Sequence, residues 1–306
     1  MLNFVRGILL LLAMTLNTLI LIGPLMLVTL VKLILPSFRL KRRCAVMAMQ
    51  IAEIWCAVNI FLVNRLLTTR WRVQGDYSLR RDTSYLVLPN HQSGADIPAL
   101  VWALNGRVPY YKFFMKRTLV WIPVIGQACW ALEYPLMHRY SKEFLQKHPE
   151  KQGKDLEITK RACEKCRGMP ITVINFPEGT RFSPEKHARQ KSPYRNLLKP
   201  KAGGISFVLA SIGDQIDTIK DVTIVYPGGV PGFVDFLFNR IPEVIIDIRQ
   251  YPLDQHWVRG DYRDDPEFRQ AFQDWINQIW REKDQRIDRI RAQLSSPNRE
   301  SDSGSG

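Results

Sequence analysis

The stretch Asn90-His91-Gln92-Ser93-Gly94-Ala95-Asp96 decides the fold of this chain. It follows the apolar run Tyr85-Leu86-Val87-Leu88, which is typical of a buried strand. A second polar stretch, Phe176-Pro177-Glu178-Gly179-Thr180-Arg181, follows another apolar run, Ile171-Thr172-Val173-Ile174. Sites in α/β domains are built at the carboxyl ends of strands. The two stretches therefore predict a cleft in which a base, an orienting carboxylate and a cation meet.

The spacing of His91 and Asp96 suits proton transfer. A neutral imidazole accepts a proton near physiological pH, and a carboxylate that fixes its tautomer makes it a directed base. Residues five positions apart lie on different faces of a helix, so we expect a turn through Ser93 and Gly94 to fold Asp96 back onto the ring. The alternative is that Asp96 is only a helix N-cap and that His91 is a hydrogen-bonded residue at a strand end.

The amino-terminal segment predicts a membrane anchor. Residues 7–31 carry no charge, which is 25 positions and enough to cross a hydrocarbon core of about 30 Å as a helix. Gly23-Pro24 interrupts this run and allows a kinked span or a re-entrant helical pair. A basic cluster, Arg39 with Lys41, Arg42 and Arg43, favours the cytoplasmic side. Residues 44–62 fit an interfacial helix, a second arm of the anchor or a buried helix of the globular domain equally well.

The composition indicates which classes of partner the protein binds. The chain has 43 Lys and Arg against 29 Asp and Glu, a formal charge of +14. With a hydrophobic anchor present, anionic lipid or a phosphorylated small molecule explains this charge better than nucleic acid, for which the sequence has no recognisable module. Five cysteines without framework spacing argue against a disulfide scaffold. Cys163 and Cys166 form a single CxxC, which we interpret as two residues one helical turn apart rather than as a zinc site.

Alternating strands and helices predict an α/β domain with a mixed sheet flanked by helices. Strands are expected at residues 70–73, 84–88, 109–115, 171–176, 222–226 and 244–248, and helices at 97–104, 156–166 and 205–212. Residues 181–201 hold seven Lys or Arg against one Glu and are expected to form a basic loop. An apolar stripe of Phe268, Phe272, Trp275, Ile276, Ile279 and Trp280 predicts a carboxyl-terminal amphipathic helix that packs on the core.

These motifs together resemble the glycerolipid acyltransferases, the 1-acylglycerol-3-phosphate acyltransferase family. Residues 90–96 resemble its NHxxxxD motif, and residues 176–181 match its FPEGTR motif. Lys116 with residues 121–126 is similar to its second block, and residues 222–227 fall where its fourth block belongs. The resemblance covers residues 65–230, and residues 139–165 resemble a bacterial membrane subgroup that contains YihG. Phe182 stands where many members carry a serine.

The resemblance implies roles for individual residues. His91 would be the general base that takes the proton from a glycerol hydroxyl, and Asp96 would orient it. The hydroxyl oxygen would attack the thioester of acyl-CoA or acyl carrier protein, with no cofactor and no metal. The implied substrate-binding residues are Glu178, Gly179, Thr180, Arg181 and Lys116. Arg181 would supply a cation to the acceptor phosphate, and Lys116 could assist, although a solvated lysine explains it nearly as well.

The expected organisation is a membrane anchor over residues 1–64, an acyltransferase domain over 65–294 and a disordered tail over 295–306. The leading hypothesis is acylation of the sn-2 hydroxyl of lysophosphatidic acid to give phosphatidic acid, at the cytoplasmic face of a bacterial inner membrane. The partners are then membrane phospholipid or lysophospholipid and the acyl thioester. The alternatives are acylation of another lysophospholipid or of glycerol-3-phosphate, and a membrane lipid-binding protein that does not catalyse.

Overall fold

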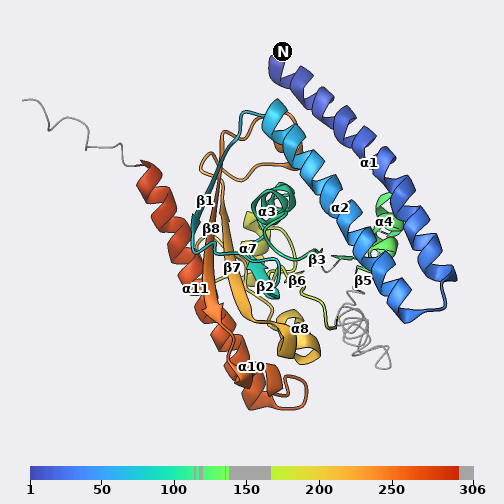
Figure 1. Cartoon of the computed structure of the whole chain (residues 1–306). Coiled ribbons are helices and arrows are strands. Elements are labelled where there is room, and N and C mark those ends of the chain that lie inside the picture. The colour runs from blue at the N-terminus through green and yellow to red at the C-terminus, as the bar shows by residue number, and fades with distance from the viewer. Residues whose placement is uncertain (114, 117–119, 135, 138–166, 296–306) are drawn as a thin grey trace, which may run out of the picture.

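The structure is a computed structural model that describes residues 1–113, 115–116, 120–134, 136–137 and 167–295. Its centre is a six-stranded sheet in the order β1-β8-β7-β2-β6-β3 (Figure 1). Neighbouring strands pair in parallel except β7 and β8, which are antiparallel, so the predicted mixed sheet is confirmed. The strands are β1 Arg70–Gly75, β2 Tyr85–Pro89, β3 Tyr111–Phe113, β6 Thr172–Ile174, β7 Thr218–Val225 and β8 Glu243–Pro252.

A separate two-stranded sheet pairs β4 Met115–Lys116 in parallel with β5 Leu136–Met137. The single strand predicted over residues 109–115 is therefore wrong in its extent, because β3 and β4 belong to different sheets.

Strand β2 is buried on both faces of the sheet, which explains its unbroken apolar sequence. Leu86 and Leu88 face a core that includes α8 Gly203–Ile212 and α11 Pro266–Ser295. Tyr85 and Val87 face the opposite core, which includes α3 Asp96–Leu104. Helices thus cover both faces of the sheet, and its strand ends are left as the place where polar loops gather.

Helix α11 confirms the predicted carboxyl-terminal stripe. Phe268, Phe272, Ile276, Ile279 and Trp280 are buried in the core on one face of the sheet, and Trp275 packs against that core. The remaining short helices are α4 Ile125–Ala131, α7 Pro184–Gln190, the 3₁₀ helix η3 Gly213–Gln215, α9 Phe233–Leu237 and α10 Gln255–Arg259.

Helix α7 corrects the expectation of an irregular basic loop over residues 181–201. Pro184 occupies the first helical turn, and the Ser183 hydroxyl caps the helix by accepting a hydrogen bond from the Lys186 N–H at 3.3 Å. The helix is only seven residues long and buries no residue, so no hydrophobic periodicity marks it in the sequence.

The amino-terminal residues form a helical hairpin of α1 Leu2–Ile34 and α2 Phe38–Leu66 (Figure 1). Both helices are long and apolar enough to cross a membrane. The Asn17 side chain ties them together, because its Nδ2 donates to the Trp55 carbonyl and to Asn59 Oδ1, each at 3.1 Å. Helix α1 continues through Pro24, and α2 ends two residues beyond the predicted boundary at residue 64.

Three predictions lie outside the described residues: the helix over 156–166 with Cys163 and Cys166, the bacterial subgroup signature over 139–165, and all of the tail except Ser295. Ser295 itself is the last residue of α11.

Candidate active site

The predicted contact between His91 and Asp96 is confirmed. His91 follows β2, Asp96 is the first residue of α3, and His91 Nδ1 lies 2.8 Å from Asp96 Oδ2. The backbone N–H groups of Gln92 and Ser93 donate to the same oxygen at 2.7 and 2.8 Å. Asp96 is not the N-cap, because Ala95 holds that position and the carboxylate turns back onto the residues before the helix.

The surroundings of Asp96 determine the tautomer of His91. Asp96 is fully buried, and the Tyr226 hydroxyl donates to its second oxygen at 2.7 Å. Burial, and then the nearby Asp96 charge, raise the pKa of Tyr226 well above its ordinary value, so the phenol stays a donor. A carboxylate surrounded by donors accepts the Nδ1 proton of His91. The Nε2 lone pair is then available to take a proton from a substrate.

Asn90 fixes the loop that carries His91 to the adjacent strand β7. Its Nδ2 donates to the Ile224 carbonyl at 3.0 Å, and its Oδ1 accepts from the Ile224 N–H at 2.8 Å. This pair of bonds imitates one step of a β-ladder, and the Asn90 side chain is fully buried. The chain therefore leaves β2 in a defined direction, with the following residue at the end of the sheet.

Glu178 connects the two sequence motifs from behind the cleft. One of its carboxyl oxygens accepts from the His91 N–H at 2.8 Å, and the other accepts from the Leu198 N–H at 3.0 Å. The side chain is fully buried, and this burial raises its pKa to about 8. The Phe182 N–H also donates to the His91 carbonyl at 2.7 Å. The described geometry therefore gives Glu178 a positioning contact with the His91 backbone rather than a place on the cavity wall.

The turn after Glu178 brings three further motif residues to the cleft. Gly179 has φ +68°, a conformation that favours glycine, and its N–H donates to the Phe176 carbonyl at 3.0 Å. Thr180 and the exposed Arg181 follow. Lys186 of α7 reaches back to this turn, and its Nζ donates to Thr180 Oγ1 at 3.0 Å and to the Arg181 carbonyl at 2.8 Å.

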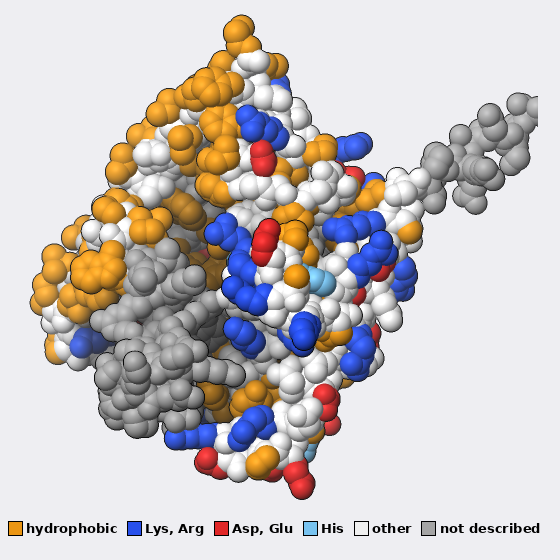
Figure 2. All heavy atoms as spheres, turned by 180° about the vertical axis from the view of Figure 1, so that it is seen from behind, with side chains coloured by type: hydrophobic (Ala, Val, Ile, Leu, Met, Phe, Trp, Pro, Cys, Tyr) orange, Lys and Arg blue, Asp and Glu red, His pale blue; other side chains and the backbone are white. Residues whose placement is uncertain are grey.

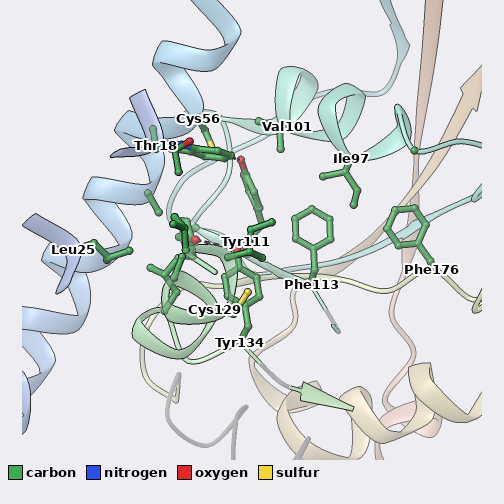
Figure 3. A pocket seen from close by; sticks show the side chains of 18 of the residues that line it. Thr18, Leu25, Cys56, Ile97, Val101, Tyr111, Phe113, Cys129, Tyr134 and Phe176 are labelled. Carbon is green, nitrogen blue, oxygen red and sulfur yellow. Dashed lines mark hydrogen bonds between the residues drawn. The ribbon is translucent and has the colours of Figure 1, made fainter. Parts of the chain in front are cut away.

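A cavity of about 820 Å³ joins this polar cluster to the amino-terminal hairpin. At one end it is lined by His91, Gly94, Gly179, Thr180, Arg181 and Lys186. Its other walls are mostly apolar, and Figure 3 shows Thr18 and Leu25 of α1 across the cavity from Phe113 and Phe176. The His91 and Phe176 ring centroids lie 4.3 Å apart, so His91 lies where the polar end meets the apolar walls.

The surface shows the same division between apolar and cationic side chains. Figure 2 shows hydrophobic side chains gathered along the side of the molecule formed by the hairpin, and Lys and Arg gathered beside a hollow next to it. Exposed apolar residues of α1 include Leu12, Leu16, Leu19, Ile20, Leu27 and Leu30.

Sequence reasoning placed His91, Asp96, Gly179, Thr180 and Arg181 correctly at one cleft. Lys116 lies in β4, and its side chain is outside the described part of the structure. Three contributing residues, Asn90, Lys186 and Tyr226, were not assigned a role although each stands in a quoted stretch. Asn90 opens the first motif and Tyr226 lies in the fourth block, whereas nothing local distinguishes Lys186 from the other cations of residues 181–201.

Comparison with known proteins shows the family of the chain. Residues 70–227 match the family model described as Acyltransferase. Lysocardiolipin acyltransferase 1 of Gallus gallus is 24% identical over 257 residues, which cover 79% of this chain and 62% of that protein. The 2-acyl-1-lysophosphatidylinositol acyltransferase of Saccharomyces cerevisiae is 30% identical over 131 residues, covering 39% of this chain and 33% of that protein.

Two further proteins are similar to this chain. The 1-acyl-sn-glycerol-3-phosphate acyltransferase epsilon of Mus musculus is 23% identical over 223 residues, covering 65% of this chain and 56% of that protein. The crystal structure of the 1-acyl-sn-glycerophosphate acyltransferase PlsC from Thermotoga maritima superposes with a TM-score of 0.52 at 17% identity. It covers 97% of this chain and 99% of that chain, so the two share a fold. The chain spans about three fifths of the length of the lysocardiolipin relatives.

Proposed function

Because the chain belongs to the acyltransferase family, we propose that it transfers a fatty acyl group from acyl-CoA or acyl carrier protein to the sn-2 hydroxyl of lysophosphatidic acid. The observation that carries the proposal is one cavity that joins a histidine–aspartate pair and two cations to mostly apolar walls. A lysolipid needs both environments, because its phosphate is anionic and its acyl chain is apolar.

In this mechanism, His91 Nε2 takes the proton from the acceptor hydroxyl as its oxygen forms a bond to the thioester carbonyl carbon. Asp96 keeps the Nδ1 proton in place and stabilises the imidazolium that results. When the tetrahedral intermediate collapses, the C–S bond breaks and the thiolate leaves, and the imidazolium supplies its proton. Positioning and proton transfer suffice for this reaction, so it needs no covalent intermediate on the enzyme.

The acceptor phosphate is proposed to lie at the polar end of the cavity, beside Thr180 and Arg181. The Gly179 turn brings these two residues to the cavity, and Arg181 supplies positive charge. Glu178 acts by holding the His91 backbone. Lys116 is proposed as a further binding residue because it stands in the second sequence block.

A second candidate acceptor is another lysophospholipid. The names of two relatives support it, since one is a lysocardiolipin acyltransferase and the other a 2-acyl-1-lysophosphatidylinositol acyltransferase. Comparing several lysophospholipids and glycerol-3-phosphate with one acyl donor separates these possibilities.

We also propose that the hairpin holds the catalytic domain at the cytoplasmic face of a bacterial inner membrane, with residues 1–64 as the anchor. The support is the apolar length of α1 and α2 together with the basic cluster at residues 39–43. For the bacterial source, the support is the subgroup resemblance of residues 139–165.

The test is acyl transfer from oleoyl-CoA to lysophosphatidic acid by purified protein in detergent, beside His91→Ala. We expect the variant to lose about 10²–10⁴-fold in kcat, the usual contribution of a general base. His256→Ala is the matched control, because His256 is an exposed histidine on α10 outside the cavity lining. Activity of His91→Ala within a few-fold of wild type would reject His91 as the base. No turnover by the wild type with any lysolipid and either donor would favour the lipid-binding alternative.

A further inference from the structure

Lys186 stands at the polar end of the cavity but belongs to neither sequence motif. It lies on α7 beyond the FPEGTR turn, lines the cavity and is half-buried. Its Nζ donates to Thr180 Oγ1 at 3.0 Å and to the Arg181 carbonyl at 2.8 Å. An ammonium group has three donors, so these two contacts leave one N–H for a ligand.

Arg181 is held at the same end of the cavity. A Cβ built at Gly94 would lie 3.5 Å from Arg181 Nη1 and 3.0 Å from the Phe233 Cβ, so the guanidinium lies beside the loop between His91 and Asp96. The contact with Phe233 is the tight one, whereas 3.5 Å is an ordinary van der Waals distance to the guanidinium. Arg181 and Lys186 therefore place two cations beside the loop that carries the proposed base.

No carboxylate opposes these cations among the described lining residues. Arg181 and Lys186 are the cationic members of that lining, and it contains neither Asp nor Glu. The carboxyl of the neighbouring motif, Glu178, is buried behind the wall, and burial raises its pKa to about 8. The described lining at the polar end thus contributes two cationic side chains and no acidic one, and the Asp96 carboxylate lies behind it against His91.

We propose that Lys186 is a specificity-determining residue that, with Arg181, binds the acceptor phosphate and selects a phosphomonoester over a phosphodiester. A terminal phosphate carries a charge of about −1.5 to −2 at pH 7. A diester phosphate carries a single charge and bears a second substituent where the second cation would bind. The inference rests on the proposed acyl transfer and names the class of acceptor for that same cavity.

The test compares two acceptors that share an acyl chain, lysophosphatidic acid and lysophosphatidylglycerol, in wild type and Lys186→Met. We expect the KM for lysophosphatidic acid to rise about 10- to 100-fold, which is what loss of one charge-assisted hydrogen bond costs. The expected change in kcat is less than about threefold, because Lys186 binds the phosphate and not the reacting oxygen. For lysophosphatidylglycerol, KM should change by less than about threefold.

Two further variants separate charge from loop geometry. Lys186→Arg keeps the cation and should restore most of the preference for the monoester. Arg189→Met is the matched control, since Arg189 is exposed on the same helix and does not line the cavity. Equal losses with both acceptors, or an unchanged KM for lysophosphatidic acid, would overturn the proposal.

Binding without the acyl donor distinguishes failure of this inference from failure of the proposed reaction. Lysophosphatidic acid and lysophosphatidylglycerol are each titrated into the detergent-solubilised protein, with tryptophan fluorescence as the readout. A monoester preference that Lys186→Met abolishes would support the phosphate site even if no acyl transfer occurs. Equal affinity of the wild type for both lipids would reject the selection, whatever the activity.

Discussion

At the residue scale, the proposed role of His91 as the base depends on how Asp96 is held. The carboxylate receives two backbone N–H groups, the imidazole and the Tyr226 hydroxyl. The first three come from residues within five positions, so the local turn alone provides them. Tyr226 comes from the end of β7 and is the long-range contact that completes the set.

Tyr226→Phe tests this contact. The substitution keeps the ring in its buried place and removes only the donor to Asp96 Oδ1. A hydrogen bond to a charged group contributes about 1.5–3 kcal/mol, so we expect kcat to fall about tenfold or more. Steady-state rates at saturating acceptor measure the effect. A kcat within twofold of wild type would mean that the backbone donors suffice to orient Asp96.

Tyr85→Phe provides the control for loss of a buried phenol. Its hydroxyl accepts from the Arg80 N–H at 2.9 Å, at the opposite end of β2 from His91. We expect this variant to lose some stability and to keep its kcat.

Individual residues show which parts of the site were predictable. His91, Asp96 and Arg181 could be assigned because each stands in a short polar stretch that directly follows an apolar strand. Tyr226 and Asn90 could not, since their decisive contacts join β7 to the β2–α3 loop across 130 and 134 positions. Lys186 could not be singled out from the sequence, because residues 181–201 contain seven Lys or Arg. Only the structure shows that α7 places Lys186 in the cavity lining.

At the element scale, α11 holds the two strands that carry the site. Lys283 is fully buried, and its Nζ donates to the Leu88 carbonyl at 2.9 Å and to the Val222 carbonyl at 2.6 Å. It also pairs with Asp221 Oδ1 at 2.7 Å. One helix thereby ties together β2 and β7 just before their chains reach Asn90 and Tyr226.

Lys283→Met tests this role of the helix. Methionine keeps most of the apolar stem but leaves a buried carboxylate and two carbonyls without the ammonium. Asp221 keeps its ion pair with Arg286 at 2.8 Å, so we expect the free energy of unfolding to fall by about 1–3 kcal/mol, the cost of leaving buried acceptors unsatisfied. Chemical denaturation in detergent measures it. Arg281→Met, at an exposed position of the same helix, should change stability by no more than about 0.5 kcal/mol. Equal effects of the two substitutions would contradict a structural role for Lys283.

The elements differ in how well the sequence predicts them, for physical reasons. Strands β2 and β6 and helices α8 and α11 bury most of one face or both, so their apolar periodicity is strong. Helix α7 buries nothing and depends on its Ser183 cap. The order of the strands in the sheet could not be predicted from the sequence, because the antiparallel β7–β8 pair and the parallel β1–β8 pair depend on contacts between distant segments.

At the scale of the whole molecule, the cavity lies between two parts of different character. Thr18, Leu21 and Leu25 of α1 form part of its wall, while the opposite wall comes from the sheet domain. Two ion pairs also connect the hairpin to the sheet domain: Lys32 with Glu133 at 3.1 Å, and Glu53 with Arg81 at 2.7 Å. If the exposed side of the hairpin lies in lipid, a lysolipid acyl chain can enter the cavity without crossing water.

This arrangement predicts that acidic residues on the exposed side of α1 will prevent the protein from binding to the membrane. Leu16 and Leu27 are 58% and 63% exposed and do not line the cavity. An acidic side chain at the bilayer centre costs about 2.5–3.5 kcal/mol, so Leu16→Glu with Leu27→Glu should abolish flotation with anionic vesicles. Activity should fall when the acceptor is in vesicles and persist when it is dispersed in detergent. Leu294→Glu, at an exposed leucine of α11, should float like the wild type. Flotation of the double variant would show that another surface holds the protein to lipid, and the hairpin would then serve only as a wall of the cavity.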